Sequence, residues 1–438
     1  MLAVAQTDTL MTQLQHKLES LALEQLARQT KFVQRTPKKI TPLNFVLGLI
    51  HIVLTGGCAL SSIASTIGLM ADQLLSKQAV AERITEAAVK FLEDVLAATL
   101  AQHLGAKTPA LHPQLAAAFP RVLVRDSTTL TLDASLAEDF PGSRNQTQQE
   151  TAIVRIQGVF DLVSQAFCSF ALTAYTRNDQ AAAEDILLLV QPADCVVQDL
   201  GFFSLPALRK IADKGAYFLS RWKFGTLLFR ADGQTPINLL KALQKHGQLD
   251  IRVCVGADEK LPARLVARRL PEAVAAERRR KAKANRDRRC TLSKPYLALL
   301  AWEIFLTNIP RAVLTAEQIS NLYDLRWRIE IMFKAWKSHF NLRNVPVASA
   351  VRVKSHIYAM LIFITLFQTE VYRSLSDTHA MTSDRPLSLL KLAQFFTEQF
   401  WAIVSQPPAT VLKHIFYHCV YERRNDRRNH VQKMSILT

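Results

Sequence analysis

The sequence has few cysteines and no cysteine pattern that would hold a metal or a redox centre. Its six cysteines among 438 residues form neither a C-x-x-C motif nor a Cys/His cluster at zinc spacing. Free thiols in a reducing cytosol fit this usage best. The six positions are Cys58, Cys168, Cys195, Cys254, Cys290 and Cys419.

The sequence also lacks a secretory leader and an uninterrupted apolar run of bilayer length. The N-terminus is polar, without a charged segment followed by an apolar one, so we expect no signal peptide. The longest apolar stretch, residues 45–60, is interrupted by His51, Thr55 and two glycines and is short for a membrane span. Internal repeats and low-complexity tracts are absent as well. We therefore expect a cytoplasmic protein that is not embedded in a membrane.

Acidic residues are scarce relative to basic ones. The chain has 37 Asp and Glu against 54 Lys and Arg, which gives a net charge of +17 at pH 7. Such a surplus favours a polyanionic partner, nucleic acid before a membrane surface. A basic but simply well-solvated surface is the alternative. The hydrophobic fraction of 49% allows large cores, and the length predicts two to four domains.

Residues 1–115 are predicted to form a helical N-terminal domain that binds DNA. Within it, residues 61–69 read as a short helix closed by Gly68. A second helix, residues 76–84, has Ser76 as its N-cap. Two helices joined by a turn, the second polar at its start, resemble a helix-turn-helix. Helix pairs of this kind are also common in bundles that touch no DNA.

Residues 116–222 favour the first part of an α/β core, because short β-like runs are interspersed with helical segments. The expected strands are 121–125, 153–160, 165–172, 195–198 and 216–220, and the expected helices are 180–190 and 205–212. Asp126 and Asp199 each follow a strand, and ligands of α/β sheets tend to bind at such strand ends. A strand-end aspartate also often only caps the next turn.

Residues 223–300 are predicted to be a basic insertion subdomain with irregular, β-leaning segments. Residues 264–289 contain eleven Lys and Arg against three Asp and Glu. A charge run of this kind is usually a solvated, flexible face. In a basic protein it also favours contact with a phosphate backbone.

The remaining chain is predicted to complete the core and then to become helical. The sheet is expected to resume at 301–306, in a core segment that covers 301–345. Residues 346–438 form a helical C-terminal region, a candidate for dimerisation, with one helix near 351–375 and another after Pro386. The basic tail that includes residues 423–428 is expected to be frayed.

One helix predicted over residues 322–337 carries an uncommon set of side chains. At about 100° per residue, five of its polar residues fall in a stripe about 80° wide. They are Tyr323, Arg326, Glu330, Lys334 and Lys337. The lone carboxylate is either half of a surface i,i+4 pair with Arg326 or a metal ligand flanked by phosphate-binding groups.

The spacing Y-x2-R-x3-E-x6-K is met at Tyr323, Arg326, Glu330 and Lys337 and resembles the signature of the DDE transposases of the insertion-sequence-4 family. The resemblance covers about residues 122–337, roughly half the chain. Upstream, the family has one aspartate after its first strand and a second after a later strand, followed by a long insertion before the glutamate helix. This sequence follows the same order.

The resemblance implies an α/β catalytic core of ribonuclease-H-like type. Such a core is a mixed sheet flanked by helices, here with an inserted β-rich subdomain and with helical N-terminal and C-terminal regions. It implies Asp126, Asp199 and Glu330 as catalytic residues and as ligands of two Mg²⁺ ions, for which Mn²⁺ would substitute. It also implies DNA-binding roles for Tyr323, Arg326, Lys334, Lys337, Arg221 and Trp302. The aromatic ring of Trp302 matches a residue on which relatives stack a flipped base.

The activity implied by the resemblance is transposition of a bacterial insertion sequence. The protein would bind terminal inverted repeats, cut the transposon ends and join the 3′-OH to target DNA, directly or through hairpin ends. The implied partners are DNA and a second copy of the chain in a synaptic homodimer. The implied location is the bacterial cytoplasm, with nucleoid association when bound to DNA.

Two rival functions remain open from the sequence. A ribonuclease-H-like nuclease or resolvase would share the metal chemistry but perform no strand transfer. An inactive relic would bind transposon ends without cutting them. Individual roles have alternatives too, since Trp302 would suit a strand in a core and Arg221 would suit a salt bridge. The N-terminal region carries no family pattern, so its DNA-binding role rests on charge and helix pairing.

Overall fold

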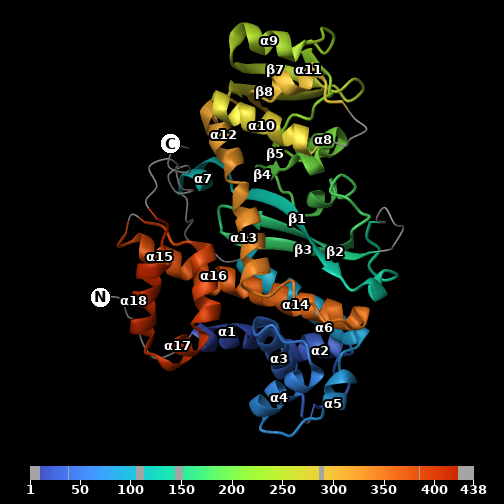
Figure 1. Cartoon of the computed structure of the whole chain (residues 1–438), viewed down its shortest axis with the longest axis vertical. Coiled ribbons are helices and arrows are strands. Elements are labelled where there is room, and N and C mark those ends of the chain that lie inside the picture. The colour runs from blue at the N-terminus through green and yellow to red at the C-terminus, as the bar shows by residue number, and fades with distance from the viewer. Residues whose placement is uncertain are drawn as a thin grey trace. The chain divides into compact units, whose positions relative to one another are not determined.

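The computed structural model describes residues 10–37, 39–104, 113–143, 151–285, 291–383 and 385–422 (Figure 1). The chain divides into two compact units, each assembled from segments far apart in the sequence. Among the described residues, the first unit consists of 10–104, 127–176 and 328–422. The second unit consists of 113–126 and 177–327.

In the described parts of the chain, nine strands are hydrogen-bonded in the order β3-β2-β1-β4-β5-β9-β8-β7-β6. Their bounds are β1 Val122–Leu132, β2 Ala152–Asp161, β3 Ala166–Ala174, β4 Cys195–Gln198, β5 Tyr217–Arg221, β6 Leu228–Arg230, β7 Leu249–Val255, β8 Leu261–Arg269 and β9 Trp302–Thr307. The pairs β1–β4 and β4–β5 are parallel, whereas β2–β3, β5–β9, β8–β9, β7–β8 and β6–β7 are antiparallel. This mixed sheet with flanking helices fits a ribonuclease-H-like core.

The second unit is built around β4 and β5. All four residues of β4 are buried, as expected for a strand whose two faces are both covered. Helix α8 (Leu205–Asp213) contacts β5 and begins at Ser204, whose side chain accepts a hydrogen bond from the Ala207 amide. Helix α12 (Ala316–Asp324) contacts β5 and β8 and begins with a capping box of Thr315 and Gln318. These contacts position the C-terminal end of α12 for the site described below.

The first unit is largely helical, as predicted for its N-terminal and C-terminal segments. Its N-terminal helices are α1 Leu10–Glu19, α2 Leu23–Gln29, α3 Pro42–Leu54, α4 Leu60–Ala71, α5 Lys77–Ala81 and α6 Glu86–Leu104. The C-terminal elements are α14 Ala350–Leu366, a π-helical turn Phe367–Arg373, α15 Ser374–Ala380, α16 Leu389–Glu398, α17 Phe400–Ser405 and α18 Pro408–His418. Helix α14 lies against α6 and α3, and both α6 and α14 contact β3 (Figure 1).

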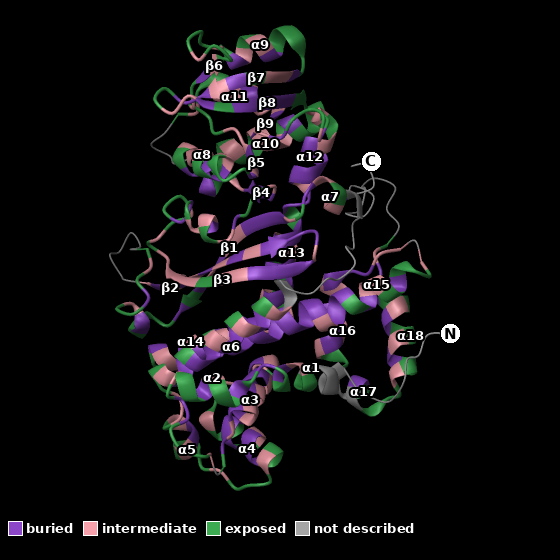
Figure 2. Ribbon diagram, turned by 180° about the vertical axis from the view of Figure 1, so that it is seen from behind, coloured by how far each residue is buried: buried purple, intermediate pink, exposed green. Residues whose placement is uncertain are grey.

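The stretch Ala350–Ala380 is long and apolar enough to cross a membrane, by length and composition alone. An 18-residue window within this stretch has a mean hydropathy of 1.5, and 78% of that window is buried inside the protein. Most of α14 is accordingly coloured as buried in Figure 2. A buried core helix passes the same test, so the stretch is weak evidence for a membrane protein.

Two details of the predicted helix pair differ from the structure. Gly68 lies inside α4 rather than at its end, since the helix continues to Ala71 and its C-cap is Asp72 with φ +50°. A Cβ at Gly68 would lie 2.6 Å from the Gln73 carbonyl oxygen, so the glycine permits the chain to turn back closely over the helix. Ser76 does cap α5 as predicted, by accepting from the Ala79 amide, but α5 has only five residues. DNA contact by this pair stays a prediction.

One further prediction in the second unit is wrong, and another is not confirmed. Residues 180–190 form turns and a 3₁₀ segment, Asp185–Leu188, instead of an α-helix. The inserted β-rich subdomain predicted at residues 223–300 is not confirmed, because β6, β7 and β8 continue the same sheet through the β8–β9 pairing. The described part of this segment, residues 223–285 and 291–300, also contains three helices, α9 Leu239–His246, α10 Glu272–Ala284 and α11 Lys294–Leu299.

The basic run is more ordered than a solvated, flexible face. Most of residues 264–285 belong to β8 and α10, and Arg264 is buried and paired with Asp250 at 2.7 Å. Residues 286–290, which include Cys290, and the tail 423–438 lie outside the described residues. The predictions for those segments are therefore not tested.

Candidate active site

Asp126 and Asp199 are neighbours in the sheet of the second unit. The parallel strands β1 and β4 pair in a register that ends with Arg125 opposite Gln198, so each aspartate is the next residue on its strand. Adjacent strands lie about 4.8 Å apart. The prediction that Asp126 ends its strand is wrong, since β1 continues to Leu132. Asp126 instead follows the last residue that β1 pairs with β4, and Asp199 follows the end of β4.

The residues before the aspartates anchor the two strands from the opposite face. Arg125 is buried and donates hydrogen bonds to the Gln198 side chain at 2.7 Å and to the Ala183 carbonyl at 2.9 Å. Its guanidinium lies 4.2 Å from the centre of the Phe202 ring. Burial lowers the pKa of Arg125 to about 9, although Asp185 and Asp179 act in the opposite direction. Because side chains alternate along a strand, the two aspartates project to the other face.

Tyr323, in the last turn of α12, and Arg326, just after that helix, contact the two aspartates. The Arg326 guanidinium places Nη1 3.5 Å from Asp126 Oδ2 and Nε 4.0 Å from Asp199 Oδ1. The Tyr323 hydroxyl donates to Asp199 Oδ1 at 3.2 Å. The exposed fractions of the side chains are 17% for Asp126, 42% for Asp199 and 11% for Arg326. Two carboxylates and one guanidinium therefore share a partly solvated site.

Tyr323 is kept protonated by its surroundings. Burial raises the pKa of its phenol to about 12, and Asp199 adds to this rise while Arg221 and Arg326 oppose it. Its ring lies 5.0 Å from the Phe305 ring, 5.1 Å from the Arg221 guanidinium and 5.7 Å from that of Arg326. The phenol is thus fixed between two cations as a hydrogen-bond donor to Asp199.

Three residues near Arg221, namely Arg268, Arg278 and Glu303, were missed by sequence reasoning. Arg278 on α10 donates to Glu303 at 3.1 Å, and Arg268 on β8 pairs with the same carboxylate at 2.8 Å. Burial alone would raise the pKa of Glu303, but Arg268, Arg278 and Arg221 together lower it below its ordinary value. The only signal for this group in the sequence is Glu303 itself, an acidic residue beside Trp302 in a strand that has no other charged residue. Glu303 is therefore a buried carboxylate that pairs with two partly exposed arginines.

Trp302 is held by the strand and loop around it. It is the first residue of β9, pairs with Arg269, and donates from Nε1 to the Gly247 carbonyl at 3.2 Å. The ring is half-buried, with the Arg269 guanidinium 5.9 Å from its centre. A base-stacking role for this ring stays a prediction.

The predicted helix over residues 322–337 is in fact two helices. Helix α12 ends at Asp324 and α13 runs from Trp327 to Ser338. Between them the amides of Leu325 and Arg326 donate to the carbonyls three residues earlier, at 3.1 and 3.0 Å. The signature residues are divided accordingly, since Tyr323 and Arg326 belong to the second unit and the α13 residues Arg328–Ser338 to the first.

Glu330, Lys334 and Lys337 share one face of α13 in the first unit. Glu330 lies in the first turn and is partly exposed, Lys334 is exposed, and Lys337 is partly exposed. At about 100° per residue these three lie on the side of the helix away from the buried Arg328 and Trp336. Burial, assisted by Arg343, lowers the pKa of Lys337. The structure thus gathers Asp126, Asp199, Tyr323, Arg326 and Arg221 in one group and Glu330, Lys334 and Lys337 in another.

The aspartate pair has the chemistry of half a magnesium site. Carboxylate oxygens are hard ligands that suit Mg²⁺, and both carboxylates are directed at a cationic group. Within the ranges that the structure describes, no three His, Cys, Asp or Glu side chains cluster closely enough to hold a metal. Asp126 and Asp199 therefore fit a divalent cation that takes its remaining ligands from other groups.

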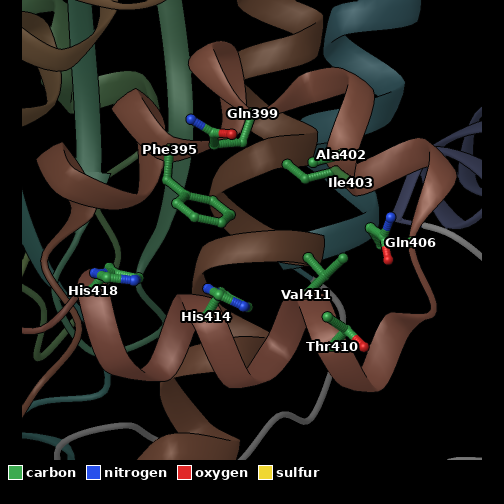
Figure 3. Close-up of a pocket in the computed structure, with 9 residues that line it drawn as sticks. All are labelled: Phe395, Gln399, Ala402, Ile403, Gln406, Thr410, Val411, His414 and His418. Carbon is green, nitrogen blue, oxygen red and sulfur yellow. The ribbon is translucent and has the colours of Figure 1, made fainter.

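A cavity of about 560 Å³ lies elsewhere, among α16, α17 and α18 of the first unit (Figure 3). Phe395 projects into it, and His414 and His418 line it from successive turns of α18. None of its nine lining residues is acidic, so it offers no carboxylates for phosphodiester chemistry.

Comparisons with known proteins identify the family of the chain. The family model for the transposase DDE domain matches residues 117–366. The chain is 29% identical to the transposase of insertion sequence element IS231D from Bacillus thuringiensis subsp. finitimus, over 82% of this chain and 79% of that protein. It is 25% identical to the transposase of IS1151 from Clostridium perfringens, over 81% and 78%.

A solved structure of a piggyBac transposase synaptic complex with hairpin DNA is also similar, at 10% identity. The similarity covers 93% of this chain and 84% of the piggyBac transposase chain. Its TM-score of 0.42 is too low to support a conclusion about the fold. The family model, in contrast, spans more than half of the chain, and its range includes Asp126, Asp199 and Glu330. The chain therefore belongs to the DDE transposases, within the insertion-sequence-4-like group, whose DNA-cleaving and strand-transferring domain depends on a divalent metal.

Proposed function

We propose that this transposase binds the terminal inverted repeats of a bacterial insertion sequence, cuts the transposon ends and joins the freed 3′-OH to target DNA. The observation that carries the proposal is the pair of register neighbours Asp126 and Asp199, held by Arg326 and Tyr323. A pair of carboxylates flanked by phosphate-binding side chains is what phosphodiester chemistry with metal ions requires.

Asp126, Asp199 and Glu330 are the residues that would hold two Mg²⁺ ions, for which Mn²⁺ would substitute. When bound, such ions supply Lewis-acid activation and stabilise the charge that develops at phosphorus. Glu330 suits this role because it is partly exposed at the start of α13, on the same face as two lysines.

The other side chains would bind and orient the DNA end. Arg326, which lies beside the aspartates, and Arg221, which lies over the Tyr323 ring, would hold phosphate oxygens near the scissile bond. Tyr323, kept protonated, would continue to donate a hydrogen bond there. Lys334 and Lys337 would extend the phosphate contacts along α13, and Trp302 would stack on a flipped base. Both the cut and the joining are in-line attacks at phosphorus, with hairpin ends as one route.

The assembly that acts would be a homodimer that brings two transposon ends together. The net charge of +17 supports DNA as the partner, because counterion release from phosphates would stabilise the complex. The protein would act in the bacterial cytoplasm, at the nucleoid when bound to DNA.

The test is cleavage and joining of a labelled transposon-end duplex in Mg²⁺. Wild type is compared with Glu330→Gln and with Glu317→Gln, a matched control that removes an exposed carboxylate from the first turn of α12. We expect cut and joined products from wild type and from Glu317→Gln. We expect at least a 1,000-fold loss with Glu330→Gln, on the scale of a lost electrostatic catalytic group.

The same assay separates the alternatives. Cutting without joining by the wild type would favour a nuclease or resolvase. End binding without cutting would indicate an inactive relic. Full activity of Glu330→Gln would remove Glu330 from the site and contradict the proposed set of metal ligands.

A further inference from the structure

Arg328 is a buried cation that the proposed chemistry does not use. It lies in the first turn of α13 and is only 5% exposed. Within the described part of the chain, its guanidinium has neutral acceptors and no carboxylate partner. An arginine stays protonated in proteins, so this guanidinium is a buried charge. Burying a charge that has only neutral partners costs stability, which indicates that Arg328 is retained for another reason.

The contacts of Arg328 join α13 to two other elements of the first unit. Its Nη2 atom donates to Gln165 Oε1 at 3.1 Å and to the Tyr372 hydroxyl at 3.4 Å. Gln165 lies in the turn between β2 and β3, and Tyr372 lies in the π-helical turn Phe367–Arg373. Arg328 is thus the polar link from the start of α13 to these two segments.

Both partners of Arg328 are themselves held in place. Gln165 has φ +54°, donates to the Leu162 carbonyl at 2.6 Å and accepts at its own carbonyl from Gln368 at 3.2 Å. The Tyr372 hydroxyl donates to the Leu387 carbonyl at 3.2 Å. A positive φ at a residue with a side chain and a π-helical turn are both uncommon conformations that often occur at functional sites. Because both residues are held by other hydrogen bonds, Gln165 Oε1 and the Tyr372 hydroxyl have little freedom to move with the Arg328 guanidinium if it is displaced.

The position of Arg328 on the helix determines where Glu330 points. Residues two apart on an α-helix differ by about 200°, so they lie on nearly opposite sides. With Arg328 bound inside the unit, Glu330 must face outward, together with Lys334 and Lys337. Packing of Trp336 against Phe167 fixes the far end of α13, whereas Arg328 fixes the end that carries Glu330.

We infer that Arg328 is a positioning residue that sets the rotation of the first turn of α13 and so orients the Glu330 carboxylate for metal binding. The inference rests on the proposed role of Glu330. It distinguishes Arg328 from an arginine that only stabilises the fold, because it predicts a change in metal dependence in addition to any change in stability.

The experiment compares wild type with Arg328→Met, which keeps much of the volume but removes the hydrogen bonds, and with Arg328→Lys. The first measurement is the Mg²⁺ concentration for half-maximal single-turnover cleavage of a transposon-end duplex. The second is hydrogen exchange of the amides at residues 327–333 in the DNA-free protein. The matched control is Arg385→Met, which removes an arginine of the same unit that donates to the Tyr421 carbonyl.

For Arg328→Met we expect about a tenfold higher Mg²⁺ requirement, faster exchange in the first turn of α13 and an unchanged KM for the DNA end. Arg328→Lys should recover part of the metal dependence, since it restores the charge and one donor. Arg385→Met should leave both measurements at wild-type values. A folded Arg328→Met protein with the Mg²⁺ requirement and exchange of the wild type would overturn the inference.

Two further variants keep the outcome decisive. If Arg328→Met does not fold, the same measurements are made on Tyr372→Phe, which removes one acceptor of Arg328. We expect its Mg²⁺ requirement to rise twofold to fivefold. An unchanged Mg²⁺ requirement would refute the inference. Glu330→Gln separates the two proposals. If it stays active, the proposed function of Glu330 fails. If it is inactive while Arg328→Met behaves as wild type, only the positioning role fails.

Discussion

Replacing Arg326 by Gln should strengthen the binding of divalent cations to the DNA-free protein. In the wild type the guanidinium lies 3.5 Å from Asp126 and 4.0 Å from Asp199, so it occupies the carboxylates that a cation would bind. A metal must displace this contact or bind against its positive charge. Removing the charge leaves two neighbouring carboxylates that repel each other, and a cation relieves that repulsion.

The size of the effect follows from these distances. A pair of unit charges 4 Å apart interacts by about 4 kcal/mol at an effective dielectric of about 20 and by about 1 kcal/mol in water. Asp126 is only 17% exposed, but Asp199 is 42% exposed, so solvent strongly screens the interaction of Asp199 with Arg326. A net gain of about 1.4 kcal/mol is therefore a conservative expectation, which corresponds to about tenfold tighter binding.

The assay is titration of the DNA-free protein with Mn²⁺, followed by electron paramagnetic resonance or calorimetry. The matched control is Arg311→Gln, which removes a cation of the same unit that pairs with Asp250 at 3.1 Å. We expect Arg326→Gln to bind Mn²⁺ about tenfold more tightly and Arg311→Gln to match the wild type. Unchanged or weaker binding by Arg326→Gln would refute the view that this guanidinium competes with the metal.

Two further predictions concern stability. The folded-state pKa of Tyr323, about 12, lies above its ordinary value of 10, so the stability it contributes is present below pH 10 and declines as the pH rises to 12. Urea unfolding of Tyr323→Phe should show less of this alkaline decline, and an identical pH profile would contradict the assignment. Trp336→Ala should destabilise the protein by about 3–5 kcal/mol, because the ring packs on Phe167, Phe170 and Phe333. A loss under 1 kcal/mol in the same measurement would show that the cluster repacks.

Local chemistry explains why parts of the fold were predictable. The run Cys195–Gln198 is short, apolar and followed by Asp199, and the structure has a strand over those four residues. Ser76 was recognisable as a helix cap because its hydroxyl satisfies a backbone amide two or three residues on. Such signals depend on a few neighbouring residues, so they can be recognised in the sequence when no distant contact competes with them.

The errors arose where distant residues compete for the backbone. Residues 180–190 contain good helix formers, yet the carbonyls of Ala182 and Ala183 accept hydrogen bonds from Arg125. An α-helix would use those carbonyls internally. The assignment of β8 to the main sheet depends likewise on pairing with β9, about forty residues later. Local patterns carry no information about either contact.

The sequence by itself provided the candidates for the proposed site, through two strand-following aspartates and the spacing of Tyr323, Arg326, Glu330 and Lys337. Only the tertiary structure decided that the two aspartates are register neighbours and that the predicted helix divides at Leu325 and Arg326. The physical reason is that neither glycine nor proline marks that division. It accompanies contacts of Tyr323 and Arg326 with residues more than 120 positions away, which a one-dimensional pattern cannot contain.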